Sequence, residues 1–340
     1  MKVKMWPLEN SNDSNSFVKL IRTESVDYVN HKWVDFFRLN FSVFHMHWPE
    51  TYLNENKFTT KYLGTLLVLL YLVYIKMFRK KIVWTVHNDM PHENTSPYFT
   101  SFAYKFFFRL TDSFVFMTND SLERCGKNIE KNENKSVCVI HHPLYKNISI
   151  DKYKGKGKGK GKGKGKGKDG CLLYFGLIRP YKNVENLIKE YSKTSQSNRL
   201  KVMGGCKGVS KEVLEQLSLG ANIELSLSRY SNLELDLELL ECLGVVIPYA
   251  KITNSGVLYQ AISSNSKILV PELPYTLEVI KHLGYKNVHF YKGDLTFKHI
   301  EDFMQSKSLT DKDFSSENFQ SKYNLNVSKS YYNVYHKVIG

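Results

Sequence analysis

The chain alternates between short apolar runs and longer stretches in which apolar residues recur with a helical period. In the first 150 residues the runs Phe41–His45 and Lys81–Val86 predict buried parallel strands, which are apolar on both faces. Strands separated by amphipathic helices indicate a parallel sheet covered on both sides. Further strands are predicted at Val3–Trp6, Ser113–Met117 and Ser136–His141, and an amphipathic helix over Phe99–Leu110.

The same alternation resumes after residue 170. A chain of 340 residues is long enough for two domains, so the two halves predict two α/β units. The strands of the second half are predicted at Leu172–Phe175, Arg199–Met203, Asn222–Leu227, Leu243–Ile247 and Lys267–Val270. The helices are predicted from Asn183 onward, over Leu233–Leu240, over Val257–Ser263 and, at the end of the chain, over Phe319–Val338.

One predicted helix, Leu66–Ile75, is apolar on all sides and is followed by Lys76, Arg79 and Lys80. Ten residues are too few to cross a bilayer, even when the helix is extended to Tyr62–Phe78. Two interpretations remain. The helix is either buried in a core or partly embedded at a membrane surface, where lysine and arginine favour anionic head groups.

The net charge of +15 invites a nucleic-acid interpretation, but much of it is local. A tract that alternates lysine and glycine over 154–168 holds eight lysines, which leaves +7 elsewhere. Such a tract cannot bury apolar surface and predicts an extended linker over 151–169. Electrostatic binding of nucleic acid or lipid is the alternative to an inert linker. The rest of the chain has no recognised nucleic-acid-binding motif.

The five cysteines are scattered and show neither a disulfide framework nor a zinc spacing. They are typical of reduced cysteines in a cytosolic protein. The start, MKVKMWPLEN, lacks the apolar core of a signal peptide and is interpreted as a first strand.

The strand Leu172–Phe175 ends in the most distinctive polar turn of the chain. Gly176 closes the strand, and Arg179 and Lys182 follow before a helix begins at Asn183. In open α/β sheets ligands bind at the carboxyl ends of strands. An arginine fork, a lysine charge and a helix N-terminus together suit a diphosphate. The turn therefore predicts an anion site, with a solvated basic turn as the alternative.

A second anion site is predicted where Thr253, Asn254, Ser255 and Gly256 open a helix. Thr, Asn or Ser can cap the helix, while glycine lets backbone N–H groups approach a ligand closely. This turn belongs to the same predicted sheet as the first, so both should lie on one edge. Simple helix capping is the alternative.

Histidines and carboxylates follow the two clearest strands of the first half. Imidazole and carboxylate can share acid–base work near neutral pH, so this edge predicts a catalytic site. Metal binding by the histidines is the alternative, but no HExxH or Cys/His set has the expected spacing. His45 falls inside the strand pattern and is interpreted as a hydrogen-bonded core histidine. The candidates are His45, His47 and Glu50 near the first strand, and His87, Asp89, His92 and Glu93 after the second.

Together these segments resemble bacterial GT-B glycosyltransferases of the kind that assemble exopolysaccharide, capsule or O-antigen. The matching segments, in order, are KVKMWPLENSNDSNSF, FHMHWPE, VWTVHNDMPHE, YFGLIRPYKN and IPYAKITNSGVLYQAISSNSKILVPE. The resemblance implies an α/β fold of two Rossmann-like domains facing across a cleft. The implied parts are an acceptor domain over 1–150, the linker 151–169, a nucleotide-sugar domain over 170–318 and a helix over 319–340 that returns to the first domain.

The resemblance also assigns roles to single residues. Arg179 and Lys182 match the basic pair that holds the donor diphosphate. Ser255 and Gly256 match the turn whose N–H groups meet the distal phosphate, and His87 matches a histidine near the donor sugar. Fixed cations and helix N–H groups can stabilise a leaving diphosphate without a metal, so neither a metal nor a cofactor is expected.

The chain departs from the family in two places. Retaining relatives carry a Glu-x7-Glu motif near residues 250–262, where this chain has Ile252 or Thr253 and then Gln260 or Ala261. Relatives often make the early loop Gly-rich, whereas here Asn and Ser occupy Asn10–Ser16.

Without the two carboxylates, the enzyme either handles its donor differently from retaining relatives or follows an inverting course. That course needs a general base to deprotonate the acceptor hydroxyl. Glu93, Glu50 and Asp89 are the candidates, in that order.

The resemblance thus implies a metal-independent hexosyltransferase that moves a sugar from a UDP- or GDP-sugar to a polyprenyl-linked oligosaccharide in surface polysaccharide synthesis. It is expected in the cytoplasm, peripheral at the inner face of the plasma membrane. Three alternatives are a non-catalytic GT-B-like nucleotide-sugar-binding protein, a GT-B epimerase acting on a nucleotide sugar, and a nucleic-acid-binding protein that uses the Lys-Gly tract.

Overall fold

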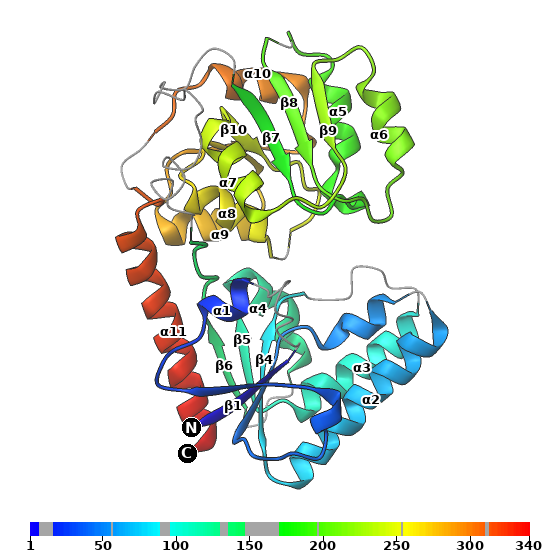
Figure 1. Cartoon of the computed structure of the whole chain (residues 1–340), viewed down its shortest axis with the longest axis vertical. Helices are drawn as coiled ribbons and strands as arrows, with labels where there is room; N and C mark the ends of the chain where they lie inside the picture. Colours follow the sequence, from blue (N-terminus) through cyan, green and yellow to red (C-terminus); the bar gives the residue numbers. More distant parts are fainter. Residues whose placement is uncertain are drawn as a thin grey trace. The chain divides into compact units, whose positions relative to one another are not determined.

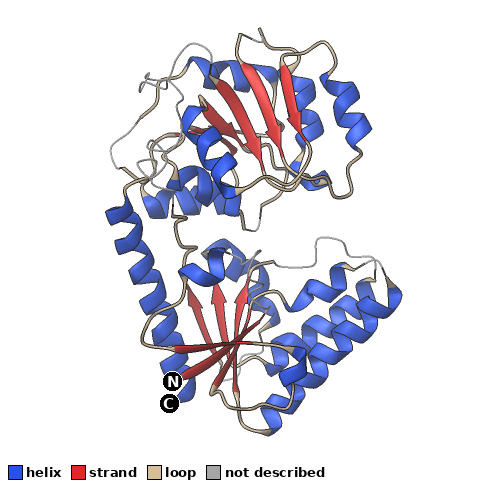
Figure 2. Ribbon diagram, viewed as in Figure 1, coloured by secondary structure: helices blue, strands red, loops and turns tan. Residues whose placement is uncertain are grey.

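The computed structural model describes residues 1–6, 16–55, 57–88, 96–129, 135–146, 170–195, 197–252, 254–309 and 313–340. These residues form two compact units, one of Met1–Pro143 with Lys322–Gly340 and one of Leu144–Ser321. Each unit is built on a six-stranded parallel sheet with helices on both faces (Figure 2). The predicted linker 151–169 lies outside the described residues.

The sheet of the first unit has the strand order β2-β1-β3-β4-β5-β6 (Figure 1). The order reverses between β1 and β3, and ligands of open α/β sheets bind at such a reversal. The segment after β3 therefore flanks the expected binding point. The strands are β1 (Lys2–Trp6), β2 (Asp27–Asn30), β3 (Val43–Met46), β4 (Lys81–Val86), β5 (Ser113–Phe116) and β6 (Ser136–Val139). The helices are α1 (Ser16–Leu20), α2 (Phe58–Met77), α3 (Pro97–Leu110), α4 (Asn119–Cys125) and the 3-10 helices Trp33–Asp35, Pro49–Asn54 and Gly126–Asn128.

Two apolar cores cover the two faces of this sheet, because successive side chains of a strand point to opposite sides. In β4, Ile82 and Trp84 pack with α2 and α3, whereas Val83 packs with α1 and α11 (Glu317–Ile339). Helix α11 contributes Tyr331 and Tyr335, both fully buried. The C-terminal helix thus completes the core of the first unit.

The sheet of the second unit has the order β12-β11-β10-β7-β8-β9 and reverses between β7 and β10. The turns after these two strands carry the two predicted anion sites. The strands are β7 (Cys171–Phe175), β8 (Arg199–Met203), β9 (Ile223–Ser226), β10 (Gly244–Val246), β11 (Ile268–Pro271) and β12 (Val288–Tyr291). The helices are α5 (Val184–Tyr191), α6 (Lys211–Ser218), α7 (Asn232–Glu241), α8 (Gly256–Ser263), α9 (Pro274–Leu283), α10 (Phe297–Gln305) and the 3-10 helix Pro180–Lys182.

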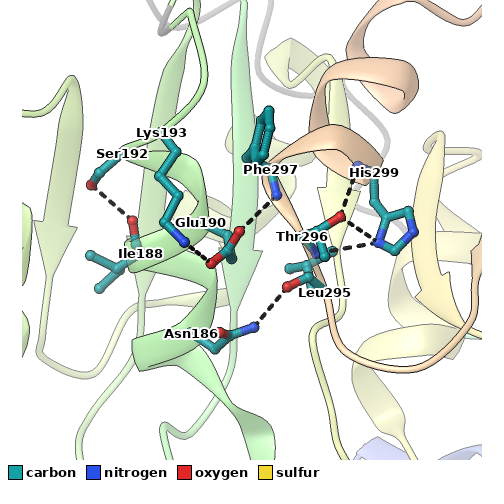
Figure 3. Close-up of polar contacts among 9 residues, drawn as sticks. All are labelled: Asn186, Ile188, Glu190, Ser192, Lys193, Leu295, Thr296, Phe297 and His299. Atoms are coloured by element: carbon teal, nitrogen blue, oxygen red, sulfur yellow. Dashed lines mark hydrogen bonds and ion pairs between the residues drawn. The ribbon is translucent and has the colours of Figure 1, made fainter.

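Helix α5 follows the basic turn and is fixed to the start of α10 by polar contacts (Figure 3). The Asn186 side chain donates to the Leu295 carbonyl at 3.0 Å, and the Phe297 N–H donates to Glu190 at 2.9 Å. Glu190 also pairs with Lys193. These contacts hold the helix, and with it the turn that begins the helix.

Helix α2 is longer than the sequence predicted. It runs over twenty residues with a mean hydropathy of 1.6 across its most apolar window, which is long and apolar enough to cross a membrane. The prediction that the segment is too short was therefore wrong. Length and composition alone are weak evidence for a span, however, because a core helix also meets them. Seven side chains are buried in the first unit: Lys61, Thr65, Val68, Leu69, Tyr71, Leu72 and Ile75.

Gly204, directly after β8, is expected to tolerate no side chain. Its φ is +148°, and a Cβ there would lie 2.0 Å from the carbonyl oxygen of Gly176. We expect Gly204→Ala to lower the free energy of unfolding by on the order of 3 kcal/mol, because backbone at the strand edge must move. Gly293→Ala is the control: its φ is also positive, at +69°, but nothing lies within 4 Å. The control should cost about 1 kcal/mol from conformation alone. Urea unfolding that gives equal losses for both variants would contradict this account.

Candidate functional site

The basic turn of the second unit is built at the carboxyl end of β7. Gly176 has a φ of +109°, which favours glycine, and leads into the 3-10 helix Pro180–Lys182. The Tyr181 carbonyl accepts from the Ala250 N–H at 3.0 Å, which ties the turn to the segment after β10. The turn thus lies at the reversal of strand order, where a ligand is expected.

The second predicted turn meets the first. A Cβ at Gly176 would lie 2.9 Å from Cγ2 of Val257, in the first turn of α8, and 3.5 Å from the Lys182 Nζ. Lys182 and the start of α8 are therefore neighbours on one sheet edge. Gly256 itself is exposed, and a Cβ there would lie 2.8 Å from the Tyr145 hydroxyl, so this glycine also has a packing role.

The start of α8 presents backbone N–H groups at this edge of the sheet. Ser255 is the N-cap, and its Oγ accepts from the Leu258 N–H at 3.2 Å, while its own N–H donates to the Tyr275 hydroxyl at 2.9 Å. Ser255 therefore caps the helix, which is the alternative that the sequence analysis gave to an anion site. The N–H groups of Gly256 and Val257 have no intrahelical acceptor, as at any helix start, and can meet an anion.

Lys182 is half-buried beneath this edge. Its Nζ lies 5.0 Å from the ring centroid of Tyr249, a cation–π distance. Burial, and to a lesser degree the charge of Arg179, lowers the pKa of Lys182 to about 8. A dianionic ligand would offset both effects by supplying countercharge.

In the first unit, Glu50 lies in the 3-10 helix Pro49–Asn54, which follows β3. This helix packs on α2 where Gly64 leaves space: a Cβ there would lie 2.5 Å from the Tyr52 ring. Glu50 is only 2% exposed, and Asn88, just after β4, donates to its Oε1 at 2.7 Å. Burial raises the pKa of Glu50 to about 7, against the opposing effect of the Asn88 hydrogen bond. A carboxyl group with that pKa can exchange protons at neutral pH.

A cluster of buried imidazoles lies beside it. His47 Nδ1 and His87 Nε2 share a hydrogen bond at 3.1 Å, and Trp48 stacks on His87 at 4.1 Å. Phe17 of α1 packs on His47, His87 and His142. Burial, with the mutual repulsion of the rings, holds the pKa of His47 and of His87 well below the ordinary value. Both rings are therefore neutral near pH 7 and act as hydrogen-bonding groups.

His45 is a core histidine, as the sequence predicted. Its Nδ1 bonds to the Tyr335 hydroxyl at 2.7 Å and its Nε2 to the Thr85 hydroxyl at 2.8 Å. Burial lowers its pKa to about 3. The residue thus fastens α11 to the sheet.

The structure brings Gly176, Lys182, Ser255 and Gly256 together in the second unit, and Glu50 and His87 onto one edge in the first. Asn254 is half-buried just before the N-cap. Thr253, Asp89, His92 and Glu93, and Asn10–Asn15 of the early loop, lie outside the described residues. Among the residues that are described, no group of three His, Cys, Asp or Glu side chains is arranged to hold a metal ion.

The sequence did not assign roles to Asn88 or Tyr249. Asn88 directly follows His87, and Tyr249 comes three residues after β10, so their positions at strand ends were the available signals. Their partners, Glu50 and Lys182, are distant in sequence, and only the fold reveals the pairing.

No protein-family model matches the chain. It is 25% identical over 262 residues to the GDP-mannose:glycolipid 4-beta-D-mannosyltransferase of Xanthomonas campestris pv. campestris, which covers 75% of this chain and 68% of that protein. Among solved structures, Anabaena Alr3699/HepE in complex with UDP is similar with a TM-score of 0.62, at 9% identity over 99% of both chains. Sucrose-phosphate synthase from Thermosynechococcus elongatus has a TM-score of 0.58, at 9% identity over 90% of this chain and 73% of the other.

With two parallel six-stranded sheets and these neighbours, the chain has the α/β GT-B fold, as predicted. The predicted resemblance to GT-B glycosyltransferases is also confirmed.

Proposed function

We propose that this GT-B protein is a glycosyltransferase that takes a hexose from a nucleotide diphosphate donor. The observation that carries the proposal is the meeting of Lys182 with the start of α8 at the reversal of strand order in the second sheet. As the bond to the sugar breaks, negative charge develops on the diphosphate. A lysine, an arginine and helix N–H groups fixed beforehand stabilise that charge. On this proposal the reaction needs no metal ion.

The first unit supplies the acceptor chemistry in this proposal. Glu50 is the general base that takes the proton of the acceptor hydroxyl, since its pKa lies near neutrality. In this proposal neutral His87 lies near the donor sugar. Attack by an activated hydroxyl in one step gives inversion at the anomeric carbon. Glu93 and Asp89 remain alternative bases from the sequence.

We further propose a polyprenyl-linked oligosaccharide as acceptor, in the synthesis of a surface polysaccharide such as exopolysaccharide, capsule or lipopolysaccharide. The similarity to a mannosyltransferase that acts on a glycolipid supports a lipid-linked acceptor. Such an acceptor sits in a membrane. The protein would then act in the cytoplasm, peripheral at the inner face of the plasma membrane.

Thermal unfolding with nucleotides tests the donor assignment. We expect UDP or GDP, and the matching UDP- or GDP-hexose, to stabilise the protein by about 2.7 kcal/mol at 100 times the dissociation constant. Binding should persist in EDTA. Protein that no UDP or GDP compound stabilises contradicts the proposal.

A product assay separates the enzyme from a non-catalytic nucleotide-sugar-binding protein, which the missing Glu-x7-Glu pair leaves as the second candidate. The enzyme releases UDP or GDP when a glycolipid acceptor is added, also in EDTA. Stabilisation by a nucleotide sugar without any release with polyprenyl-linked acceptors favours the binding protein.

A further inference from the structure

Helix α2 is apolar on two opposite sides, and the first unit covers only one of them. Val68, Leu72 and Ile75 face the sheet and are buried. The opposite side carries six exposed apolar residues at helical spacing, which we call the α2 ridge: Leu63, Leu66, Leu67, Leu70, Val73 and Met77. Leu63 is 64% exposed and Met77 75%. A continuous exposed apolar surface of this kind marks an interaction site.

The neighbouring helix α3 extends this surface. The two helices lie side by side (Figure 1), with the Tyr62 hydroxyl 2.9 Å from the Ser96 hydroxyl and the Tyr62 and Phe99 rings 4.6 Å apart. Tyr98 and Phe102 of α3 are exposed, by 94% and 47%. The apolar surface therefore spans two packed helices.

The charged residues of the two helices themselves have one sign. Neither helix contains Asp or Glu, whereas α3 exposes Lys105 and Arg109, and Arg79 follows α2. Lys76 is paired with Asp112 at 2.6 Å. Because α2 and α3 both connect parallel strands, they run in the same direction. Arg79 and Arg109 thus lie toward the same end of the pair.

We propose that the α2 ridge, with Tyr98 and Phe102, is a docking surface for an anionic lipid bilayer, with α2 lying in the plane of the interface. Apolar side chains beside cations match acyl chains beside anionic head groups. The helix does not cross the bilayer, because withdrawing Leu72 and Ile75 from the sheet would expose the core. This docking surface rests on the proposed function in one respect: a lipid-linked acceptor lies in a membrane, so a transferase that uses one must bind there. The structural observations for the surface do not depend on that function.

Vesicle flotation without substrate tests the docking surface. We expect the full chain to bind vesicles of equal parts phosphatidylcholine and phosphatidylglycerol more tightly than phosphatidylcholine alone. Leu66→Gln with Leu70→Gln should lower the partition coefficient at least about tenfold, because two inserted side chains become polar. Arg79→Gln with Lys80→Gln should weaken binding to the anionic vesicles only. The matched control is Leu237→Gln with Leu240→Gln, two leucines of α7 in the second unit that are each 47% exposed.

Two results would overturn the proposal. One is equal vesicle binding by the wild type and the Leu66/Leu70 variant. The other is a dimer in gel filtration that this variant converts to a monomer, because a second copy would then cover the ridge. If vesicle binding fails while UDP or GDP still stabilises the protein, the docking surface is wrong and the glycosyltransferase function is not.

Discussion

Lys182→Ala is expected to lower kcat/KM for the nucleotide sugar by on the order of 10²–10³ fold, the usual cost of removing one fixed group that stabilises developing charge. The ammonium lies beside Gly176 and the start of α8, where the diphosphate is proposed to bind. Arg179→Ala should also remove most of the activity. Lys292→Ala is the control, since that lysine is 81% exposed in the same unit. Initial rates over a range of donor concentrations measure the effect, and near-wild-type turnover in Lys182→Ala would sink the diphosphate assignment.

The same lysine gives donor binding a pH dependence of known sign. The pKa of Lys182 is lowered to about 8, so the group is charged below pH 8 and neutral above it in the free protein. A bound diphosphate favours the charged form. Donor affinity should therefore fall as pH rises through 8. Lys182→Arg should bind with little dependence on pH over this range, because a guanidinium stays protonated. If Lys182→Arg keeps the same pH dependence of donor binding, that dependence comes from the titration of another group.

The fold was largely predictable because buried parallel strands are continuous apolar runs. Strands β4 and β8 have the predicted limits, Lys81–Val86 and Arg199–Met203. Strands β2 and β12 were missed. Their sequences, DYVN and VHFY, are short and are interrupted by polar residues, so neither shows a continuous apolar run.

The apolar helix shows a different limit of sequence patterns. The predicted core Leu66–Ile75 lies inside α2, but the helix begins eight residues earlier, at Phe58. Lys61 and Thr65 precede the predicted apolar core and are polar, and yet both are buried. A hydropathy pattern gives the centre of such a helix and not its packing.

The sequence predicted which single residues lie at the candidate site, but it did not predict which of them contact each other. Strand ends identified Gly176, Lys182 and the start of α8, because the reversal of strand order gathers them on one edge. The contact between Asn88 and Glu50 joins residues 38 positions apart and depends on how a 3-10 helix packs against Gly64. Sequence spacing contains no such information. For this reason the sequence identified Glu50 only from its position after a predicted strand. The burial that raises its pKa appears only in the fold.

Glu50→Gln is expected to lower kcat by on the order of 10²–10⁴ fold if Glu50 is the general base, while donor binding stays intact. Glutamine keeps the shape and can still meet Asn88, so the loss would come from proton transfer. Glu55→Gln is the control, an exposed carboxylate directly after the same 3-10 helix. If Glu50→Gln keeps full kcat, Glu50 is not the general base. Glu93 and Asp89 are then the candidates, and Glu93→Gln and Asp89→Asn test them.

The pH profile distinguishes a base from a structural acid at this position. The pKa of Glu50 is raised to about 7, so the base form predominates above pH 7 and activity should be lost as pH falls below it. Asn88 donates to Glu50 and favours the charged carboxylate. Asn88→Ala should therefore raise the pKa of Glu50 and move the acidic limb of kcat to higher pH. A purely structural Glu50 predicts a loss of stability in Asn88→Ala with the limb unmoved. The direction in which that limb moves thus reports whether the buried carboxyl group handles the acceptor proton.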